Sequence, residues 1–239
     1  MKKYLFILAA ALTSAIVLSS CNDSEGDYPE FWSFATVKTL DGGGYYFQFD
    51  DQKTAYPGDK TRIAGYEAKE GQRVVIYFNR LPDQQPGYDD NIALYSIRNM
   101  RPDDVKVINT QEELDALGND RTGIYLPARL KGDYLDIEIL YPMTDYKKHT
   151  FTLASVNFPQ VEPQADEDLV EQPDTENYVI LELRHNADGD TNCYESRDLL
   201  SFRLGEFHPK ALGKKGVMIR TRSLTHGTIW FKVDFSEEK

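Results

Sequence analysis

The chain has 239 residues and a formal net charge of −12, from 27 lysines and arginines against 39 aspartates and glutamates. An acidic surface repels phosphate, and the richest basic interval, residues 210–222, is small, so we expect no nucleic-acid partner. The length suits one large or two ordinary domains of about 100 to 200 residues each, and the 15 tyrosines and 12 phenylalanines favour sheets over helices.

Residues 1–20 have the layout of a secretory signal peptide. Lys2 and Lys3 precede an apolar run, Tyr4 to Leu18, that is shorter than the roughly 20 residues a membrane-spanning helix needs. The ending Leu18-Ser19-Ser20-Cys21 resembles the lipobox of bacterial lipoproteins. That resemblance implies cleavage just before Cys21 and lipidation of this cysteine by acyl chains such as palmitate. The membrane is then the expected partner of the mature N-terminus, and a retained transmembrane helix is the weaker alternative.

Residues 21–30 form a short acidic tether that contains four acids and one proline. Its acids resemble the signal that sends lipoproteins of Bacteroidetes-type bacteria to the outer face of the outer membrane. We therefore expect a lipid-anchored outer-membrane protein displayed at the cell surface, against the alternative of a soluble acidic spacer. With Cys21 acylated, Cys193 has no partner for an internal disulfide, so buried apolar area must stabilise the fold.

The next part of the chain predicts five or six short strands with bends and little helix, which is typical of a small barrel of the OB type. The turn Asp41-Gly42-Gly43-Gly44 separates the first two strands. The strands are expected at Trp32–Leu40, Tyr45–Asp50, Lys53–Tyr56, Val74–Phe78, Ile92–Met100 and Val105–Ile108. Because apolar residues are consecutive in Val74–Phe78, we expect that strand to be covered on both faces.

One helix is predicted in the mature chain, over residues 109–118. Thr110 and Glu113 form a capping box, Leu114 and Leu117 share an inward face, and Gly118 can take the left-handed closing position. Two helical turns are too few to be stable alone, so the helix must dock on a flanking β unit. We expect an OB-like domain over residues 31–118, ending with this helix.

Residues 119–239 predict a second domain, an immunoglobulin-like β-sandwich, so the fold class is all-β. Leu135, Ile137 and Ile139 alternate with acids, as in a sheet with one wet face. An exposed crossing loop rich in prolines and acids is expected over Pro159–Thr175. The seven strands are expected at Ile124–Leu130, Tyr134–Tyr141, His149–Phe158, Tyr178–Arg184, Leu199–Leu204, Val217–Arg222 and Thr228–Phe235.

Over nearly its whole length, the sequence resembles the NigD-like lipoproteins. Besides the lipobox, the resemblance rests on Asp41–Pro57 (DGGGYYFQFDDQKTAYP), Gly71–Phe78 (GQRVVIYF), Lys147–Val156 (KKHTFTLASV) and Leu181–Asp190 (LELRHNADGD), of which the LRHN stretch is the most specific. The resemblance implies an N-terminal OB-like domain followed by a C-terminal β-sandwich. It also implies a bacteriocin-immunity role, which is presumed from the operon of the gene that gave the family its name, and no catalytic residues.

The loop after the LRHN stretch is the candidate binding loop, with His185, Asn186, Asp188 and Asp190. Its spacing fails for calcium, because counting back from Gly189 puts an arginine at the first ligand position of an EF-hand. Zinc would need three or four well-spaced ligands. We therefore expect no metal and no cofactor, and a turn in which the Asp and Asn side chains bond their own backbone.

No motif of an enzyme is present, so we expect a non-enzymatic binding or immunity-type protein in the cell envelope. The unknown partner is a protein or a glycan, and a surface glycan-binding accessory lipoprotein is the alternative function. Exposed tyrosines could stack on a glycan or contact a protein, and a contiguous exposed patch would mark such a site. The tyrosines to compare are Tyr45, Tyr46, Tyr88, Tyr95 and Tyr141.

Overall fold

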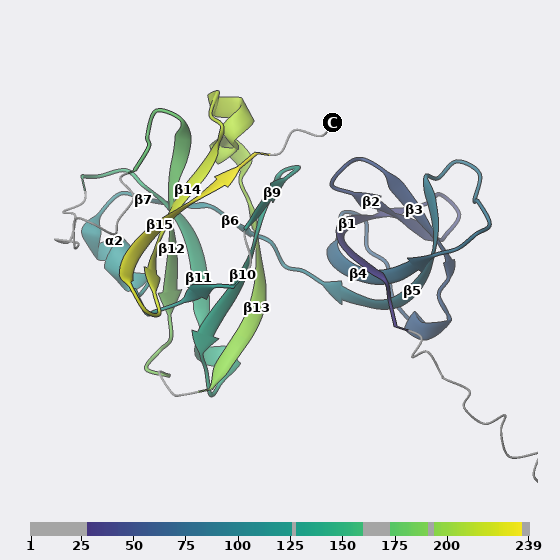
Figure 1. Cartoon of the computed structure of the whole chain (residues 1–239), viewed down its shortest axis with the longest axis horizontal. Coiled ribbons are helices and arrows are strands. Elements are labelled where there is room, and N and C mark those ends of the chain that lie inside the picture. The colour runs from purple at the N-terminus through teal and green to yellow at the C-terminus, as the bar shows by residue number, and fades with distance from the viewer. Residues whose placement is uncertain (1–27, 126–127, 160–172, 191–193, 236–239) are drawn as a thin grey trace, which may run out of the picture.

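The structure, a computed structural model, describes residues 28–125, 128–159, 173–190 and 194–235. The expected signal peptide, the lipidation residue Cys21, most of the tether, Cys193 and most of the crossing loop lie outside the described residues. Within the described ranges, no helix has the length and apolar character needed to cross a membrane. Figure 1 shows two β domains side by side, joined by the segment that follows β5.

The first domain is a closed five-stranded barrel with the strand order β1-β2-β3-β5-β4, in which β4 pairs back with β1. All neighbours are antiparallel except β3 and β5. The elements are β1 (Phe31–Thr39), β2 (Tyr45–Phe49), β3 (Thr54–Asp59), a short 3-10 helix η1 (Thr61–Ile63), β4 (Arg73–Arg80) and β5 (Asp90–Asn99). The predicted OB-like barrel is confirmed.

Alternation along the strands fills the barrel. Tyr45, Phe47 and Phe49 of β2 face inward, as their two-residue spacing predicts. β4 is buried on both sides over part of its length, because Val75 points away from the barrel interior and packs with Phe34 and Met100 against the second domain. The expectation of a doubly covered β4 is therefore met at Val75, while the next outward residue, Tyr77, is exposed.

The second domain is a sandwich of two five-stranded sheets. One sheet has the order β6-β13-β10-β8, with β9 also pairing with β10, and the other has the order β15-β14-β12-β11-β7. Aliphatic side chains from both sheets, including Leu135, Ile137, Leu181 and Ile219, form the core between them. The strands are β6 (Asp103–Asp104), β7 (Lys106–Ile108), β8 (Gly123–Ile124), β9 (Arg129–Lys131), β10 (Tyr134–Pro142), β11 (Thr150–Val156), β12 (Tyr178–Asn186), β13 (Glu195–Arg203), β14 (Gly216–Ser223) and β15 (Gly227–Asp234).

The β-sandwich is confirmed, and its strand pairing is mixed, with both parallel and antiparallel pairs. Three pairs are parallel: β6 with β13, β7 with β11, and β12 with β14. The single strand expected at Ile124–Leu130 is divided into β8 and β9. Short helical segments complete the domain: α2 (Gln111–Ala116), η2 (Tyr146–Lys148), η3 (Gly205–Phe207) and η4 (Pro209–Leu212).

The domain boundary expected after Gly118 needs correction. β6 and β7 pair with strands of the two sandwich sheets, and α2 packs Leu114 against Ile108 and Ala154 of the second sheet. The chain therefore leaves the barrel after Met100 and enters the sandwich at β6. The amphipathic pattern of the helix shows that it docks, but it contains no information about which flanking unit it docks on.

Candidate functional site

The LRHN loop stabilises its own turn and the neighbouring chain. The His185 and Asp190 side chains are buried, Asn186 is half-buried and Asp188 is exposed. Asp190 Oδ2 accepts hydrogen bonds from the backbone N–H groups of Asp145 at 2.6 Å and Thr144 at 2.8 Å. These two bonds lower the pKa of Asp190, although burial opposes the change. The four residues that we expected to form a binding loop are thus mainly occupied within the fold.

The same stretch holds the chain that follows α2. Arg184 Nε donates to the carbonyl oxygen of Gly118 at 2.6 Å, and the Asp120 N–H donates to the carbonyl oxygen of His185 at 2.8 Å. The Ala187 N–H donates to Asp120 Oδ2 at 2.8 Å. These contacts give the LRHN stretch a structural role, which is to attach residues 118–120 to the end of β12.

His185 also belongs to a buried pair of imidazoles. Its Nε2 shares a hydrogen bond of 2.9 Å with His149 Nδ1, and its Nδ1 shares one of 3.1 Å with the carbonyl oxygen of Arg121. The His185 ring stacks on Phe151 at 4.4 Å between ring centroids. Burial lowers the pKa of His185. Throughout the described chain, no three histidine, cysteine, aspartate or glutamate residues gather as a metal site.

The five tyrosines that we singled out do not form one exposed patch. Tyr45 and Tyr141 are buried in the two domain cores. Tyr88 contacts Tyr46 and Tyr56, with ring centroids 5.4 Å and 5.2 Å apart, and all three are half-buried. Two aromatic residues that are exposed, Trp32 and Tyr77, face each other across β1 and β4.

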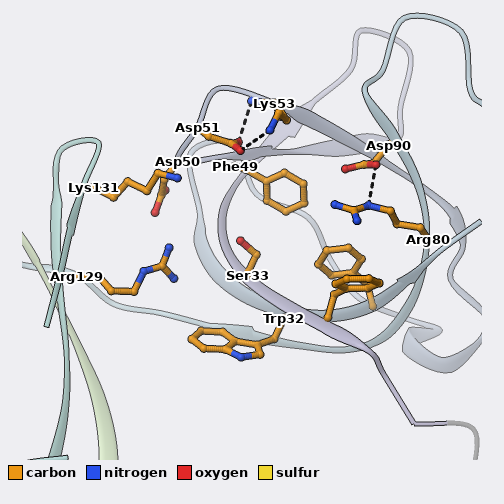
Figure 2. A pocket seen from close by; sticks show the side chains of 12 residues that line it. Trp32, Ser33, Phe49, Asp50, Asp51, Lys53, Arg80, Asp90, Arg129 and Lys131 are labelled. Carbon is orange, nitrogen blue, oxygen red and sulfur yellow. Dashed lines mark hydrogen bonds and ion pairs between the residues drawn. The ribbon is translucent and has the colours of Figure 1, made fainter. Parts of the chain in front are cut away.

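A pocket at one end of the barrel is the better candidate site (Figure 2). It has a volume of about 180 Å³. Its floor is a stack of three phenylalanines, in which Phe78 lies 5.7 Å from Phe31 and 5.8 Å from Phe49 between ring centroids. Both domains line it: Phe31, Trp32, Ser33, Phe49, Asp50, Asp51, Lys53, Phe78, Arg80 and Asp90 come from the barrel, and Arg129 and Lys131 come from β9 of the sandwich.

Most charges around the pocket are neutralised within the fold. Asp51 pairs with Lys53 at 3.1 Å, and Asp90 pairs with Arg80 at 3.0 Å. The carboxylate of Asp50 points into the domain seam, where it binds Arg73 through two hydrogen bonds. These lining carboxylates are therefore committed to cations of the protein.

Arg129 differs from the other cations of the pocket. Its guanidinium lies 5.1 Å from the Phe34 ring centroid and 6.0 Å from that of Trp32. Among the residues that the structure describes, no carboxylate or carbonyl oxygen accepts a hydrogen bond from it. Figure 2 shows that its side chain extends from β9 toward the barrel end, beside Ser33 and Trp32.

The pocket lies next to a buried ion triad that joins the two domains. Arg73 of β4, 1% exposed, donates to both Asp50 and Asp136, and its Nη2 lies 2.8 Å from Asp136 Oδ2 on β10. The guanidinium also stacks 4.2 Å from the Tyr134 ring centroid. Burial raises the pKa of Asp136, and the charge of Arg73 counteracts that increase. The triad fixes β4 and the residue that follows β2 against β10, next to the β9 residues that close the pocket.

Sequence reasoning did not identify Trp32, Arg129 or the ion triad. One signal for Trp32 was present, because alternation from buried Ala35 places it on the outer face of β1. No signal in the sequence pointed to Arg129, since its approach to the barrel depends on the docking of two domains.

The comparisons with known proteins match the whole two-domain arrangement. A family model described as the NigD-like N-terminal OB domain matches residues 34–100, and one described as the NigD-like C-terminal beta sandwich domain matches residues 105–235. No curated protein matches the chain.

Solved structures share this fold at low sequence identity. A protein of unknown function from Bacteroides vulgatus has a TM-score of 0.71 and 18% identity, over 86% of this chain and 90% of its own. A NigD-like immunity protein from Bacteroides caccae has a TM-score of 0.56 and 18% identity, over 86% and 98%. A protein named as a lipoprotein, from Bacteroides fragilis, has a TM-score of 0.53 and 12% identity, over 87% and 99%.

Proposed function

Since the chain belongs to the NigD-like family, we propose that it is a lipid-anchored, non-enzymatic protein of the cell envelope that acts by binding a partner, in an immunity-type role. The proposal places the anchor at Cys21, the outer membrane as the location and the cell surface as the working side. The immunity protein and the lipoprotein among the structural neighbours support the proposal through their shared fold.

The observation that carries the proposal is the character of the barrel-end pocket. Its lining combines half-exposed Trp32 with a guanidinium that has no carboxylate partner in the described chain, and tryptophan and arginine dominate protein interfaces. None of its twelve lining residues is a histidine or a cysteine, and Ser33 Oγ donates to a backbone carbonyl at 3.1 Å. The pocket therefore has the groups of a binding site and lacks a nucleophile placed beside a base.

Lipid attachment is tested by replacing the acylated cysteine. Two or three acyl chains, at about 0.8 kcal/mol per buried CH₂, hold a protein durably on a membrane. Cys21→Ala should therefore shift the protein from the membrane fraction to the soluble fraction, or stop the precursor before processing. The measurement is fractionation with incorporation of a fatty-acid probe, and Cys193→Ala is the matched control that should keep the label. Labelling of the Cys21→Ala variant would refute the assignment.

The immunity-type role is tested in cells. Deleting the gene should sensitise the cell to a toxin encoded beside it, and the wild-type gene should restore resistance whereas the Cys21→Ala gene should not. The measurement is survival next to a producer strain. Unchanged survival of the deletion strain would contradict the immunity role.

A surface glycan-binding role is the second candidate, and the exposure of Trp32 favours it. An exposed indole is a surface on which a sugar ring stacks, and Trp32 is 48% exposed at the mouth of the pocket. This role predicts retention of the folded protein on a polysaccharide array, and loss of retention in Trp32→Ala. A blank array with folded wild-type protein would remove this candidate.

A further inference from the structure

Among the residues that the structure describes, the guanidinium of Arg129 has no anionic partner. Arg129 is half-buried, and within the described residues its guanidinium contacts the ring faces of Phe34 and Trp32. Cation–π contacts position a guanidinium and satisfy none of its five N–H donors. Partial burial of a charge without a counter-charge costs free energy, so the site gains when an anion enters.

The local charge balance favours an anion in an otherwise acidic chain. The pocket is lined by four cations, Lys53, Arg80, Arg129 and Lys131, and by three carboxylates. The complete chain, by contrast, has a net charge of −12. The pocket is therefore a small region of positive excess on an acidic protein, and the charge that complements it is negative.

The size of the pocket limits what carries that charge. At about 180 Å³ it is smaller than the roughly 300–1,000 Å³ of sites that enclose a drug-sized ligand. It therefore accepts one chemical group rather than a whole ligand. The phenylalanine stack of the floor requires that this group have an apolar stem.

From these observations we propose that the pocket binds one carboxylate of a partner protein, on an acidic side chain or at a chain end. Arg129 donates two parallel hydrogen bonds to the carboxylate, and the apolar stem lies against Phe31 and Trp32. The inference rests on the proposed binding function and adds the chemistry of the partner.

The lining carboxylates make a protein a better partner than an acidic sugar. A uronic acid would bring ring hydroxyls that need hydrogen-bond acceptors. Each carboxylate around this pocket already binds a cation of the protein: Asp50 binds Arg73, Asp51 binds Lys53 and Asp90 binds Arg80. A carboxylate on an apolar stem requires donors alone, and Arg129 supplies them.

Trp32 provides the readout of the binding test. The chain has two tryptophans, so Trp230→Phe leaves Trp32 as the single indole fluorophore. In that background the protein is titrated with N-acetylphenylalanine, with its neutral amide N-acetylphenylalaninamide and with glucuronate. The variants are Arg129→Gln and, as a matched control, Lys60→Gln, which removes another cation held over an aromatic ring, 5.2 Å from that of Tyr45 and outside the pocket.

N-acetylphenylalanine should change Trp32 emission and bind at least tenfold more tightly than its amide. Arg129→Gln should abolish that preference, and Lys60→Gln should keep it. Equal binding of the acid and the amide by the folded parent protein would overturn the inference, even if Arg129→Gln did not fold. Binding of glucuronate without N-acetylphenylalanine would also overturn it and would assign the pocket to acidic glycans.

The cell assay separates this inference from the proposed function. A deletion strain that becomes toxin-sensitive, with no carboxylate preference in the titration, would leave the immunity role in place and overturn the pocket assignment. An Arg129-dependent carboxylate preference, with unchanged survival of the deletion strain, would support the pocket and contradict the immunity role.

Discussion

His185 illustrates at the residue scale how burial couples a side chain to pH. Burial lowers its pKa, while the hydrogen bond to the Arg121 carbonyl oxygen and the charge of Asp120 act in the opposite direction, and the nearby His149 adds to the lowering. The folded state therefore resists protonation of His185 in the range where the unfolded chain, with a pKa near 6.5, accepts a proton.

The sign of the pH dependence follows from proton uptake. Well above pH 6.5 His185 is neutral in both states and contributes no pH dependence, whereas around and below pH 6.5 the unfolded chain binds more protons than the folded protein. We expect the free energy of unfolding to decrease as the pH falls from 6.5 toward the lowered pKa. Urea unfolding at several pH values measures this slope, and His185→Phe should reduce it. An identical slope in the variant would show that other groups cause it.

At the residue scale, the sequence predicted the local turn around Asn186 but not the contacts between residues that are distant in the chain. The expected turn, in which Asn186 and its neighbours bond their own backbone, is present, because Asn186 Oδ1 accepts from the Asp188 N–H at 2.9 Å. His149 could not be identified as the partner of His185. The two residues are 36 positions apart, and they meet because Phe151 pairs with His185 between β11 and β12. Such contacts depend on strand register, which short-range patterns do not specify.

At the scale of elements, Gly118 shows why the chain after α2 tolerates little change. Gly118 has a φ of +75°, and a Cβ atom there would lie 2.7 Å from Asn186 Cα and from the His185 carbonyl oxygen. Gly65 is a matched control, because its φ of +86° is similar and a Cβ atom there would meet nothing within 4 Å beyond its own chain neighbours.

Both alanine substitutions should be destabilising, and to different extents. Gly65→Ala should cost about 1–2 kcal/mol, the penalty of the left-handed backbone. Gly118→Ala should cost a further ~1–3 kcal/mol, because the added methyl group collides with backbone that cannot move freely. Denaturant midpoints of the two variants and the wild type measure the difference. Equal midpoints for the two variants would contradict the close packing of Gly118 on β12.

The strands and the helix were easier to predict than the elements with which they pair. The strands of the barrel and the capped helix follow local signals. Thr110 Oγ1 accepts from the Glu113 N–H, as expected for the N-cap of a capping box, whereas Glu113 Oε2 accepts from the N–H of Asn109 rather than from that of Thr110. The place of α2 in the sandwich was missed, because β7 pairs with β11 across 48 positions. A two-residue strand such as β6 has no hydrophobic period, so its parallel pairing with β13 could not be predicted.

At the scale of the whole molecule, two ion pairs join the domains in different environments. The Arg73 triad is buried, whereas Arg98 and Asp198 form an exposed pair at 2.6 Å, with side chains 55% and 39% exposed. Removing the cation of the buried triad leaves two carboxylates without compensation in the seam. Removing the cation of the exposed pair leaves a carboxylate that water can solvate.

Because of these environments, we expect two similar substitutions to change the free energy of unfolding by very different amounts. Arg73→Gln should lower the free energy of unfolding by roughly 3–5 kcal/mol, whereas Arg98→Gln should lower it by less than about 1 kcal/mol. Arg73→Gln should also loosen the seam, which small-angle scattering would detect as a larger radius of gyration of the folded protein. Similar losses in both variants would contradict a dominant role of the buried triad in joining the domains.

The order in which strands find their partners has a consequence for how the protein is made. Every pairing of the barrel lies within residues 31–99, so this module can fold as soon as that part of the chain has been synthesised. β6 must wait much longer, since the contact of Asp104 with Arg203 closes a loop of 99 positions. Until the last strands have been synthesised, a finished barrel would therefore be followed by sandwich strands without neighbours. This interval is when the chain most needs a chaperone.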